Sequence, residues 1–407
     1  MKKFHLFDVF GVELEYMIVN RDTLSVMPIT DQLIAAKIGE IASDVENGPI
    51  AWSNELTAHV IEIKTNGPVK SYKGLADDFH ANILEINALL APFNAMLLPT
   101  AAHPFMNPFT ETVLWQHDNN EVYALYNRIF DCRGHGWSNL QSMHLNLPFA
   151  NDEEFGKLHA AIRFLLPIIP AITASSPMLD GQLTASLDAR MKTYSSNQAR
   201  LPQLMGALIP EAVFTEAEYK KVIFEPIKNA IEPFDKEGIM DEHFLNSRGA
   251  IARFDRGAIE IRVMDLQECP AADVALAAFV SEVLKYLSMP DYIEKNKLTA
   301  WHHSDLRSIF DDVVEKAEGT IIHNKSYLKA LGMNTESATA QAIWKHLFNS
   351  VSKNIDLEHH AIITSILKNG SLSTRISTQL KTNSSHENVV FVYRQLAACL
   401  HSNQLFL

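Results

Sequence analysis

Cysteine is scarce in this chain of 407 residues. Its three cysteines, Cys132, Cys269 and Cys399, lie far apart, and no CxxC pair occurs. This spacing argues against a disulfide framework or a zinc cluster, so we expect a reducing, cytoplasmic compartment. The sequence also lacks an apolar run long enough to span a membrane, and acidic residues interrupt the apolar N-terminal segment. We therefore expect neither a signal peptide nor a membrane partner.

Positive charge is also in short supply. The chain has 35 Lys and Arg against 48 Asp and Glu, a formal net charge of −13. A nucleic-acid-binding protein usually carries a basic stripe, so we expect no nucleic acid partner. A polyphosphate substrate would need local neutralisation here, which metal ions could supply. The remaining composition, 47% apolar and 20% charged, is that of an ordinary globular protein.

Several familiar catalytic motifs are missing from the sequence. It contains no GxxxxGK[ST] phosphate loop, no HExxH zinc helix and no GxSxG nucleophile elbow. If the protein binds phosphates, the usual glycine-rich backbone cradle does not hold them.

Four segments show the period-two alternation of a strand with one apolar and one polar side. They cover residues 10–19, 59–64, 141–147 and 258–264. Their polar sides carry, in chain order, Glu13, Glu15, Glu62, His144 and Glu260. Two glutamates spaced by two residues usually mark a solvated face. Here, however, three other segments place an acidic residue or a histidine on a matching face, which favours a shared site.

Helical periodicity separates and follows these strands. An apolar stripe recurs at spacings of three and four over residues 75–97, another covers 276–287, and four segments near 304–316, 337–350, 356–368 and 387–401 also indicate helices. Strands interspersed irregularly with helices predict an α+β fold with a largely antiparallel sheet. We expect a sheet-based section over residues 1–290 and a helical section over 291–407, with a soft boundary near Pro290.

Carboxylates gathered on one face of a sheet repel one another, and burial would drive them to protonate. Divalent cations remove this problem. Carboxylate oxygens with one imidazole suit magnesium or manganese better than zinc. Glu55 lies seven residues before Glu62, an odd separation that puts the two on opposite faces of a straight strand. It joins the group only if the chain turns near residues 56–58, and an exposed loop glutamate is the alternative.

Two further segments suggest anion binding. Arg253, Arg256 and Arg262 surround Glu260, and Arg262 shares its face, where its planar fork could clamp an anionic group. An Arg–Glu pair on the sheet surface is the alternative. The polar run over residues 193–200 suits a nucleotide, although such runs are commonly loops or helix caps. Its hydroxyls, amide and cation belong to Ser195, Ser196, Asn197 and Arg200.

These segments, in this order, resemble the glutamate–cysteine ligase family, especially its plant-like and bacterial carboxylate–amine ligase branches. The resemblance covers roughly residues 8–290 and rests on FGVELEYMIV, NELTAHVIEIKTNGP, SMHLNLPF, YSSNQAR and ARFDRGAIEIRVMD. It implies a glutamine-synthetase-like fold, with the sheet curved into a funnel. It implies magnesium at Glu13, Glu15, Glu55, Glu62, His144 and Glu260, substrate-binding or catalytic roles for Arg253 and Arg262, and nucleotide contacts from residues 195–200.

The resemblance implies an ATP- and magnesium-dependent ligase that γ-glutamylates an amine such as cysteine through an acyl phosphate. Its partners would be small-molecule amino acid and amine substrates. Two alternatives stay open, a metal-dependent phosphohydrolase and a non-catalytic small-molecule sensor on a ligase scaffold. Residues 291–407 match no part of the family and no cysteine pocket is apparent, so the amine is undefined. The sequence allows a homo-oligomer without defining its size.

Overall fold

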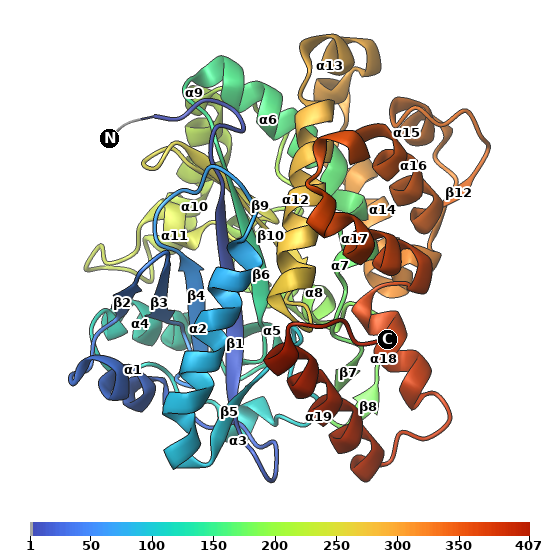
Figure 1. The fold of residues 1–407 in the computed structure, drawn as a ribbon. Helices are drawn as coiled ribbons and strands as arrows, with labels where there is room; N and C mark the ends of the chain where they lie inside the picture. Colours follow the sequence, from blue (N-terminus) through green and yellow to red (C-terminus); the bar gives the residue numbers. More distant parts are fainter. Residues whose placement is uncertain (1–2) are drawn as a thin grey trace.

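An antiparallel sheet of eight strands forms the centre of the protein (Figure 1). The computed structural model describes residues 3–407. The strand order is β2-β3-β4-β1-β6-β10-β9, and β5 also pairs with β1. The eight strands are β1 (Gly11–Asn20), β2 (Asp44–Asn47), β3 (Ile50–Asn54), β4 (Val60–Thr65), β5 (Ala95–Leu98), β6 (Ser142–Pro148), β9 (Ala250–Arg253) and β10 (Ala258–Asp265). Two small hairpins pair β7 (Met178–Leu179) with β8 (Gln182–Leu183) and β11 (Ile321–Ile322) with β12 (Ala338–Thr339).

The four strands predicted from alternation are β1, β4, β6 and β10, and all four are confirmed. They are also neighbours, because β1 lies between β4 and β6, and β6 lies between β1 and β10. The pairings among these strands are antiparallel. The predicted α+β class with a largely antiparallel sheet is therefore confirmed as well.

Helices enclose the sheet. Two long helices near it, α2 and α12, pack against each other and against its apolar face, where the inward side chains of β1 join one large apolar cluster (Figure 1). The helices are α1 (Thr30–Ile38), α2 (Leu75–Leu90), α3 (Pro108–Glu111), α4 (Asn120–Phe130), α5 (His135–Ser138), α6 (Asp152–Leu165), α7 (Pro170–Thr173), α8 (Ala189–Tyr194), α9 (Glu216–Tyr219), α10 (Glu225–Ile231), α11 (Glu242–Leu245), α12 (Pro270–Leu287), α13 (Pro290–Asn296), α14 (His303–Lys316), α15 (Lys325–Ala330), α16 (Ala340–Val351), α17 (Leu357–Asn369), α18 (Leu372–Leu380) and α19 (His386–Ser402).

The helix predicted over residues 75–97 is shorter than its apolar stripe suggests. It ends at Leu90, a short turn containing Pro92 follows, and Asn94 adopts a left-handed conformation with φ 54°. Leu97 therefore lies in β5, paired with Ile18 of β1. A proline and a left-handed residue break the helix, while spacings of three and four continue by chance into the strand.

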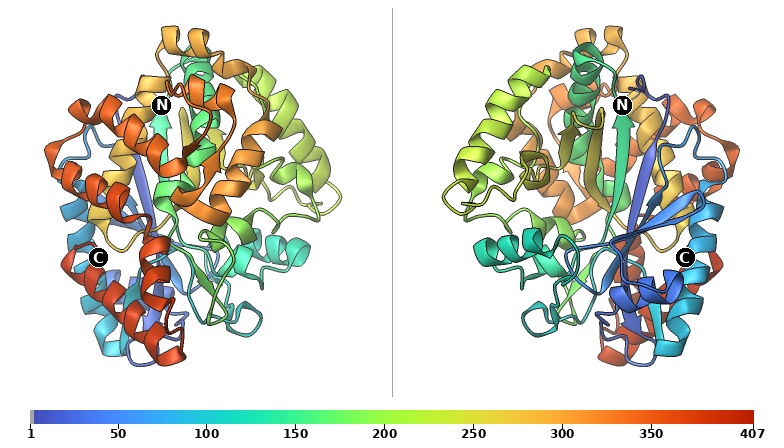
Figure 2. Two further views of the ribbon diagram at one scale, coloured as in Figure 1. Left: turned by 90° about the vertical axis from the view of Figure 1, so that its right-hand side faces the viewer. Right: turned by 90° about the vertical axis from the view of Figure 1, so that its left-hand side faces the viewer.

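The helices of the last quarter of the chain pack along one side of the molecule, opposite β2 and β3 (Figures 1 and 2). Phe279 of α12 contacts Trp344 of α16, with ring centroids 5.1 Å apart, so both predicted sections share one apolar cluster. The division near Pro290 stays a prediction. No helix within residues 3–407 is both long and apolar enough to cross a membrane.

Candidate metal and substrate site

The polar side chains of β1 lie at the centre of the candidate site because strands pair on both sides of them. Cα pairing places Glu13 opposite His144 of β6 on one side and Lys64 of β4 on the other. Glu15 lies opposite Glu62. Antiparallel register thus brings four segments that are far apart in the sequence to one patch of the sheet. Their opposite faces bury apolar residues.

Two overlapping groups of candidate metal ligands occupy this patch. Glu13, Glu62 and His144 form one, Glu15, Glu55 and Glu62 form the other, and the ligand atoms within each group lie within 4.8 Å of one another. Both groups include Glu62, whose side chain is buried. Carboxylate oxygens at this spacing, with one imidazole, match the oxygen-rich ligand sets of magnesium and manganese.

Glu55 belongs to the second group because the chain turns near residues 56–58, between β3 and β4. Strand β3 ends at Asn54, β4 begins at Val60, and the Val60 N–H donates to the carbonyl of Thr57 at 3.1 Å. Glu55 therefore lies on a hairpin connection and not on a straight strand. Burial, together with the charges of Glu62 and Glu15, raises its pKa well above the usual range.

His144 is held between carboxylates. Its Nδ1 lies 3.0 Å from Glu13 and 3.9 Å from Glu260, and its Nε2 lies 2.9 Å from the hydroxyl of Ser142. Burial opposes its charged form, but the hydrogen bond to Glu13 and the surrounding carboxylates raise its pKa to about 9. Burial likewise opposes ionisation of Glu13, but His144 lowers its pKa to about 2. The imidazolium thus partly balances the carboxylates.

Lys64 supplies a second balancing charge. Its Nζ lies 2.9 Å from Glu62, 2.8 Å from the Ser53 hydroxyl and 3.3 Å from Asp44. Burial and the charge of Glu13 raise the pKa of Glu62 to about 7, even though Lys64 opposes this rise. A cation bound at Glu62 would replace interactions that Lys64 now makes.

Glu260 lies beside the two groups but is a member of neither. It forms an ion pair with Arg262, and Arg253 approaches it to 4.0 Å. Burial raises the pKa of Glu260, but Arg262 and His144 outweigh that effect and lower it. The Nε of Arg262 is buried and finds no hydrogen-bond partner among residues 3–407. A buried N–H donor is therefore unsatisfied on the side chain that pairs with Glu260.

The polar run over residues 195–200 is largely engaged in local contacts. Ser195 and Ser196 donate to the carbonyls of Lys192 and Thr193, which are part of α8. Asn197 donates to Gly136 at 2.7 Å. Arg200 donates to Ile129 and stacks over Phe234, 4.9 Å from its ring centre. These contacts form a helix end and a loop, and only Ser196 and Arg200 of the four predicted residues are exposed.

The structure adds residues to the site that sequence reasoning missed. The Ser142 backbone N–H donates to Glu15 at 2.6 Å, and the Asn146 amide donates to Glu13 at 3.0 Å. Tyr194, at the end of α8, lies beside Arg262. Lys64, Ser142 and Asn146 share the predicted polar faces, so period two could have found them. Tyr194 is the first residue of the YSSNQAR motif, but nothing in that motif predicts its place beside Arg262.

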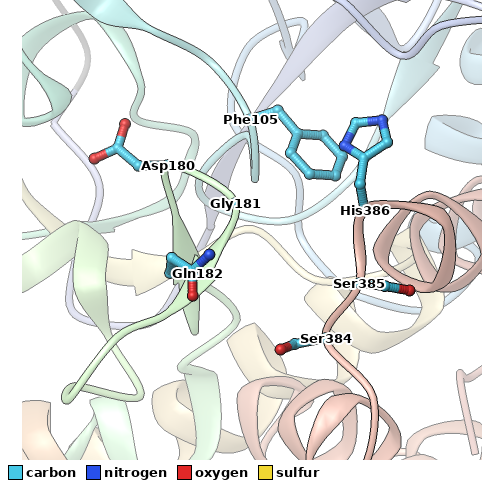
Figure 3. Close-up of a pocket in the computed structure, with 7 residues that line it drawn as sticks. All are labelled: Phe105, Asp180, Gly181, Gln182, Ser384, Ser385 and His386. Carbon is cyan, nitrogen blue, oxygen red and sulfur yellow. The ribbon is translucent and has the colours of Figure 1, made fainter.

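A separate open pocket lies between the β7–β8 turn and the start of α19 (Figure 3). Phe105 and His386 contact each other on one of its sides, with ring centroids 4.4 Å apart and ring planes tilted by 43°. Its polar side chains, on Asp180, Gln182, Ser384 and Ser385, are exposed. None of its lining residues belongs to the carboxylate groups, so this pocket is not part of the candidate site.

Comparisons with known proteins identify relatives along most of the chain. A protein of Archaeoglobus fulgidus without an assigned function is 28% identical over 98% of this chain and 100% of its own length. A Cronobacter sakazakii protein with the provisional name glutamate–cysteine ligase 2 is 25% identical over 68% of this chain and 67% of its own.

Two solved structures share the fold. A glutamate–cysteine ligase from Francisella tularensis, in complex with AMP, aligns with a TM-score of 0.58 and 13% identity over 98% of this chain and 90% of its own. A bifunctional glutathione synthetase from Pasteurella multocida aligns with a TM-score of 0.63 and 12% identity over 98% of this chain. The chain spans about half the length of that second protein, namely 53%.

The sequence model of glutamate–cysteine ligase family 2 (GCS2) matches residues 9–312, about three quarters of the chain. The match runs past the expected end near residue 290, so the expectation that residues 291–407 match no part of the family is wrong for residues 291–312. This range contains all the predicted metal ligands and both predicted substrate arginines. The chain therefore belongs to glutamate–cysteine ligase family 2 and is a ligase of the carboxylate–amine class.

Proposed function

We propose that this ligase uses ATP and magnesium to join the γ-carboxylate of glutamate to an amine such as cysteine. The observation that carries this proposal is the position of Arg262. Its guanidinium pairs with Glu260, which lies 3.9 Å from His144 of the first ligand group, and its buried Nε has no hydrogen-bond partner within residues 3–407. One site thus offers ligands for cations that hold phosphates and a donor that can hold a carboxylate. The AMP bound to the Francisella relative supports use of a nucleotide.

The reaction needs activation because a carboxylate is a poor electrophile whose charge repels an electron-rich amine. Transfer of the terminal phosphoryl group of ATP forms a P–O bond to the substrate carboxylate and releases ADP. The amine nitrogen then forms a C–N bond to the acyl carbon, phosphate leaves with the C–O electron pair, and one proton leaves the nitrogen. Most of the catalytic effect in phosphoryl transfer comes from positioning and charge stabilisation.

Different residues of the chain would bind the metal, the acid substrate and the nucleotide. Glu13, Glu15, Glu55, Glu62 and His144 would hold magnesium or manganese, with Glu260 beside them. A bound divalent cation would screen the negative charge of the phosphates. Arg262, together with Arg253, would hold the acid substrate as a planar fork holds a carboxylate. Ser196 and Arg200, the exposed members of the polar run, are the proposed nucleotide contacts. With all three cysteines unpaired, we also propose a cytoplasmic location.

Hydroxylamine capture tests this proposal without knowledge of the natural amine. Hydroxylamine is small, neutral near pH 7 and strongly nucleophilic, so it should convert an acyl phosphate to a hydroxamate. We expect glutamyl hydroxamate to accumulate only when ATP, magnesium and glutamate are all present. Omission of ATP and chelation of magnesium are the matched controls. Steady ATP hydrolysis with no hydroxamate, across a panel of acids, would instead support a phosphohydrolase.

A further inference from the structure

A β-bulge lies where Arg262 leaves the regular sheet. Strand β10 pairs with β6 in register up to Ile261, opposite Leu145, and pairing resumes at Met264, opposite Met143. Three steps along β10 therefore correspond to two along β6, which is one extra residue. A bulge bends a strand and re-aims the side chains on it. The direction of the Arg262 side chain thus depends on what holds the bulge in place.

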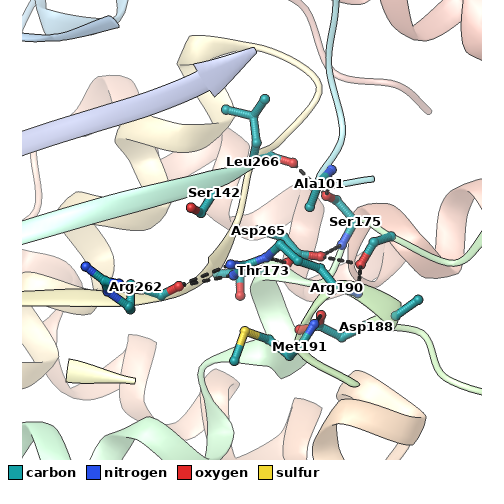
Figure 4. Close-up of polar contacts among 12 residues, drawn as sticks. Ala101, Ser142, Thr173, Ser175, Asp188, Arg190, Met191, Arg262, Asp265 and Leu266 are labelled. Carbon is teal, nitrogen blue, oxygen red and sulfur yellow. Dashed lines mark hydrogen bonds and ion pairs between the residues drawn. The ribbon is translucent and has the colours of Figure 1, made fainter. Parts of the chain in front are cut away.

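A second arginine, Arg190, makes hydrogen bonds to both ends of the bulge. Its side chain is buried, and its two terminal nitrogens donate to the Arg262 carbonyl at 3.3 and 3.2 Å. Its Nε donates to Asp265, three residues further along β10. The planar guanidinium therefore bridges two points of the bulged strand, as Figure 4 shows. An ammonium group could not make all these contacts in one orientation.

Asp265 is itself fixed to another part of the chain. Its second oxygen accepts hydrogen bonds from the Ser175 N–H and the Ser176 hydroxyl, both at 2.8 Å. The Ser176 hydroxyl also accepts from the Arg190 N–H at 3.0 Å. Asp188, directly before α8, caps that helix at the Met191 N–H and is fully buried. Arg190 is thus fixed by hydrogen bonds through both its backbone and its side chain.

We propose that Arg190 is a positioning residue that, through the Arg262 carbonyl and Asp265, holds the bulge and so fixes the position of the Arg262 guanidinium for binding of the acid substrate. This inference rests on the proposed function, because it takes Arg262 as the residue that binds the acid. Arg190 need not touch substrate. Its side-chain hydrogen bonds reach β10 at residues 262 and 265 and, within residues 3–407, no candidate metal ligand, although the charge of Glu15 also acts on Arg190. We therefore expect its effect on the acid to exceed its effect on the cations.

The test is Arg190→Lys, with Arg163→Lys as the matched control. Arg163 is also a buried arginine that donates to backbone carbonyls, those of Pro210 and Trp301, but it contacts no site residue. We expect Arg190→Lys to raise the KM for glutamate at least about tenfold in the hydroxamate assay, since small misplacements cost this much or more. The KM for ATP and the magnesium requirement should stay within about twofold, and Arg163→Lys should change none of these constants.

Two outcomes would overturn the proposal. One is a similar loss of kcat in Arg190→Lys and Arg163→Lys, with the KM values for glutamate and ATP unchanged. The other is a similar fall in Tm in both variants, with no change in any kinetic constant. If Arg190→Lys does not fold, Ser176→Ala loosens the same anchor more gently and should raise the KM for glutamate in the same direction. Failure of that variant to change the KM would also overturn the proposal.

A failure of the proposed function would look different, because the wild-type protein would then form no hydroxamate with any acid. Crystal structures of the wild type and Arg190→Lys decide the positioning question in that case. A displaced Arg262 side chain supports the role of Arg190 in holding the bulge. An Arg262 side chain that keeps its place beside Glu260 overturns it.

Discussion

Glu62 differs from the other acidic residues of the site because its carboxylate belongs to both ligand groups. Loss of Glu13, Glu15 or Glu55 would affect one group, whereas loss of Glu62 affects both. Its carboxylate also has partners without any metal, since Ser53 donates to it at 2.7 Å and Lys64 pairs with it. The fold around it should therefore tolerate a change to an amide of the same shape.

We predict that Glu62→Gln raises the magnesium concentration for half-maximal hydroxamate formation at least about tenfold, and more than Glu13→Gln or Glu55→Gln does. Outer-shell changes alone commonly cost ten- to hundredfold in metal affinity, and this residue is placed to be a direct ligand. Magnesium titrations of the three variants provide the measurement. Glu46→Gln, an exposed glutamate on β2, is the control and should match the wild type. Equal titration midpoints for Glu62→Gln and the wild type would show that Glu62 is not a magnesium ligand.

Among the elements, β10 shows most clearly how local packing sets the site. The Arg262 N–H donates to the carbonyl of Gly249 at 3.0 Å, just before β9. A Cβ added at Gly249 would lie 2.7 Å from Cγ1 of Val263, inside the bulge. Glycine at this position therefore lets the chain approach the bulged strand closely.

We predict that Gly249→Ala displaces the bulge, lowers stability by about 1–3 kcal/mol, the usual cost of overpacking, and raises the KM for glutamate. Urea unfolding gives the free energy and the hydroxamate assay gives the KM. Gly319→Ala is the control, because a Cβ there meets no atom within 4 Å. A Gly249→Ala protein with the wild-type free energy of unfolding would show that the Val263 side chain can move aside without loss of stability.

At this same scale, the sequence predicts some elements and not others for physical reasons. Alternation of apolar residues identifies β1, β4, β6 and β10 because one face of each is fully buried. The edge strand β2 and the short β5 lack that pattern and are missed, as is α18. The polar faces of the four strands also predict which acidic residues gather, and Glu13, Glu15, Glu62 and His144 do lie together.

What the sequence cannot predict is how separate segments meet. The bulge at Arg262 follows from packing against Gly249 and Arg190, which are 13 and 72 residues away along the chain. A buried arginine such as Arg190 has no sequence pattern of its own. The participation of Glu55 depends on a hairpin turn that spacing alone left undecided.

The whole molecule encloses a histidine that stays neutral inside it. His159 of α6 is fully buried, stacks on Phe155 and bonds the Val213 carbonyl at 2.8 Å. Burial, with the nearby charge of Arg163, lowers its pKa to about 3. In the unfolded chain its pKa is about 6.5. Below pH 6.5 the unfolded state therefore takes up a proton that the folded state does not, and stability is lost as pH falls towards 3.

We predict that the wild type loses about 2 kcal/mol more unfolding free energy than His159→Phe does between pH 7.5 and pH 5. The other titrating groups are common to both proteins and cancel in the difference. Phenylalanine keeps the stacked ring, and the lost Val213 bond adds an offset that does not depend on pH. Urea unfolding at the two pH values provides the measurement. Parallel stability curves for the two proteins would show that His159 does not resist protonation.

The order β4-β1-β6-β10 has a consequence for how ligand binding and folding are coupled. The candidate ligands come from chain segments as far apart as residues 13 and 260, so no short stretch of the protein can form the centre by itself. The centre comes into existence only when these strands have paired, and its affinity for a cation is a property of the native state alone. By mass action, saturation with magnesium and nucleotide should then raise the melting temperature. Thermal denaturation thereby becomes a way to detect ligands for this protein before any of its substrates is known.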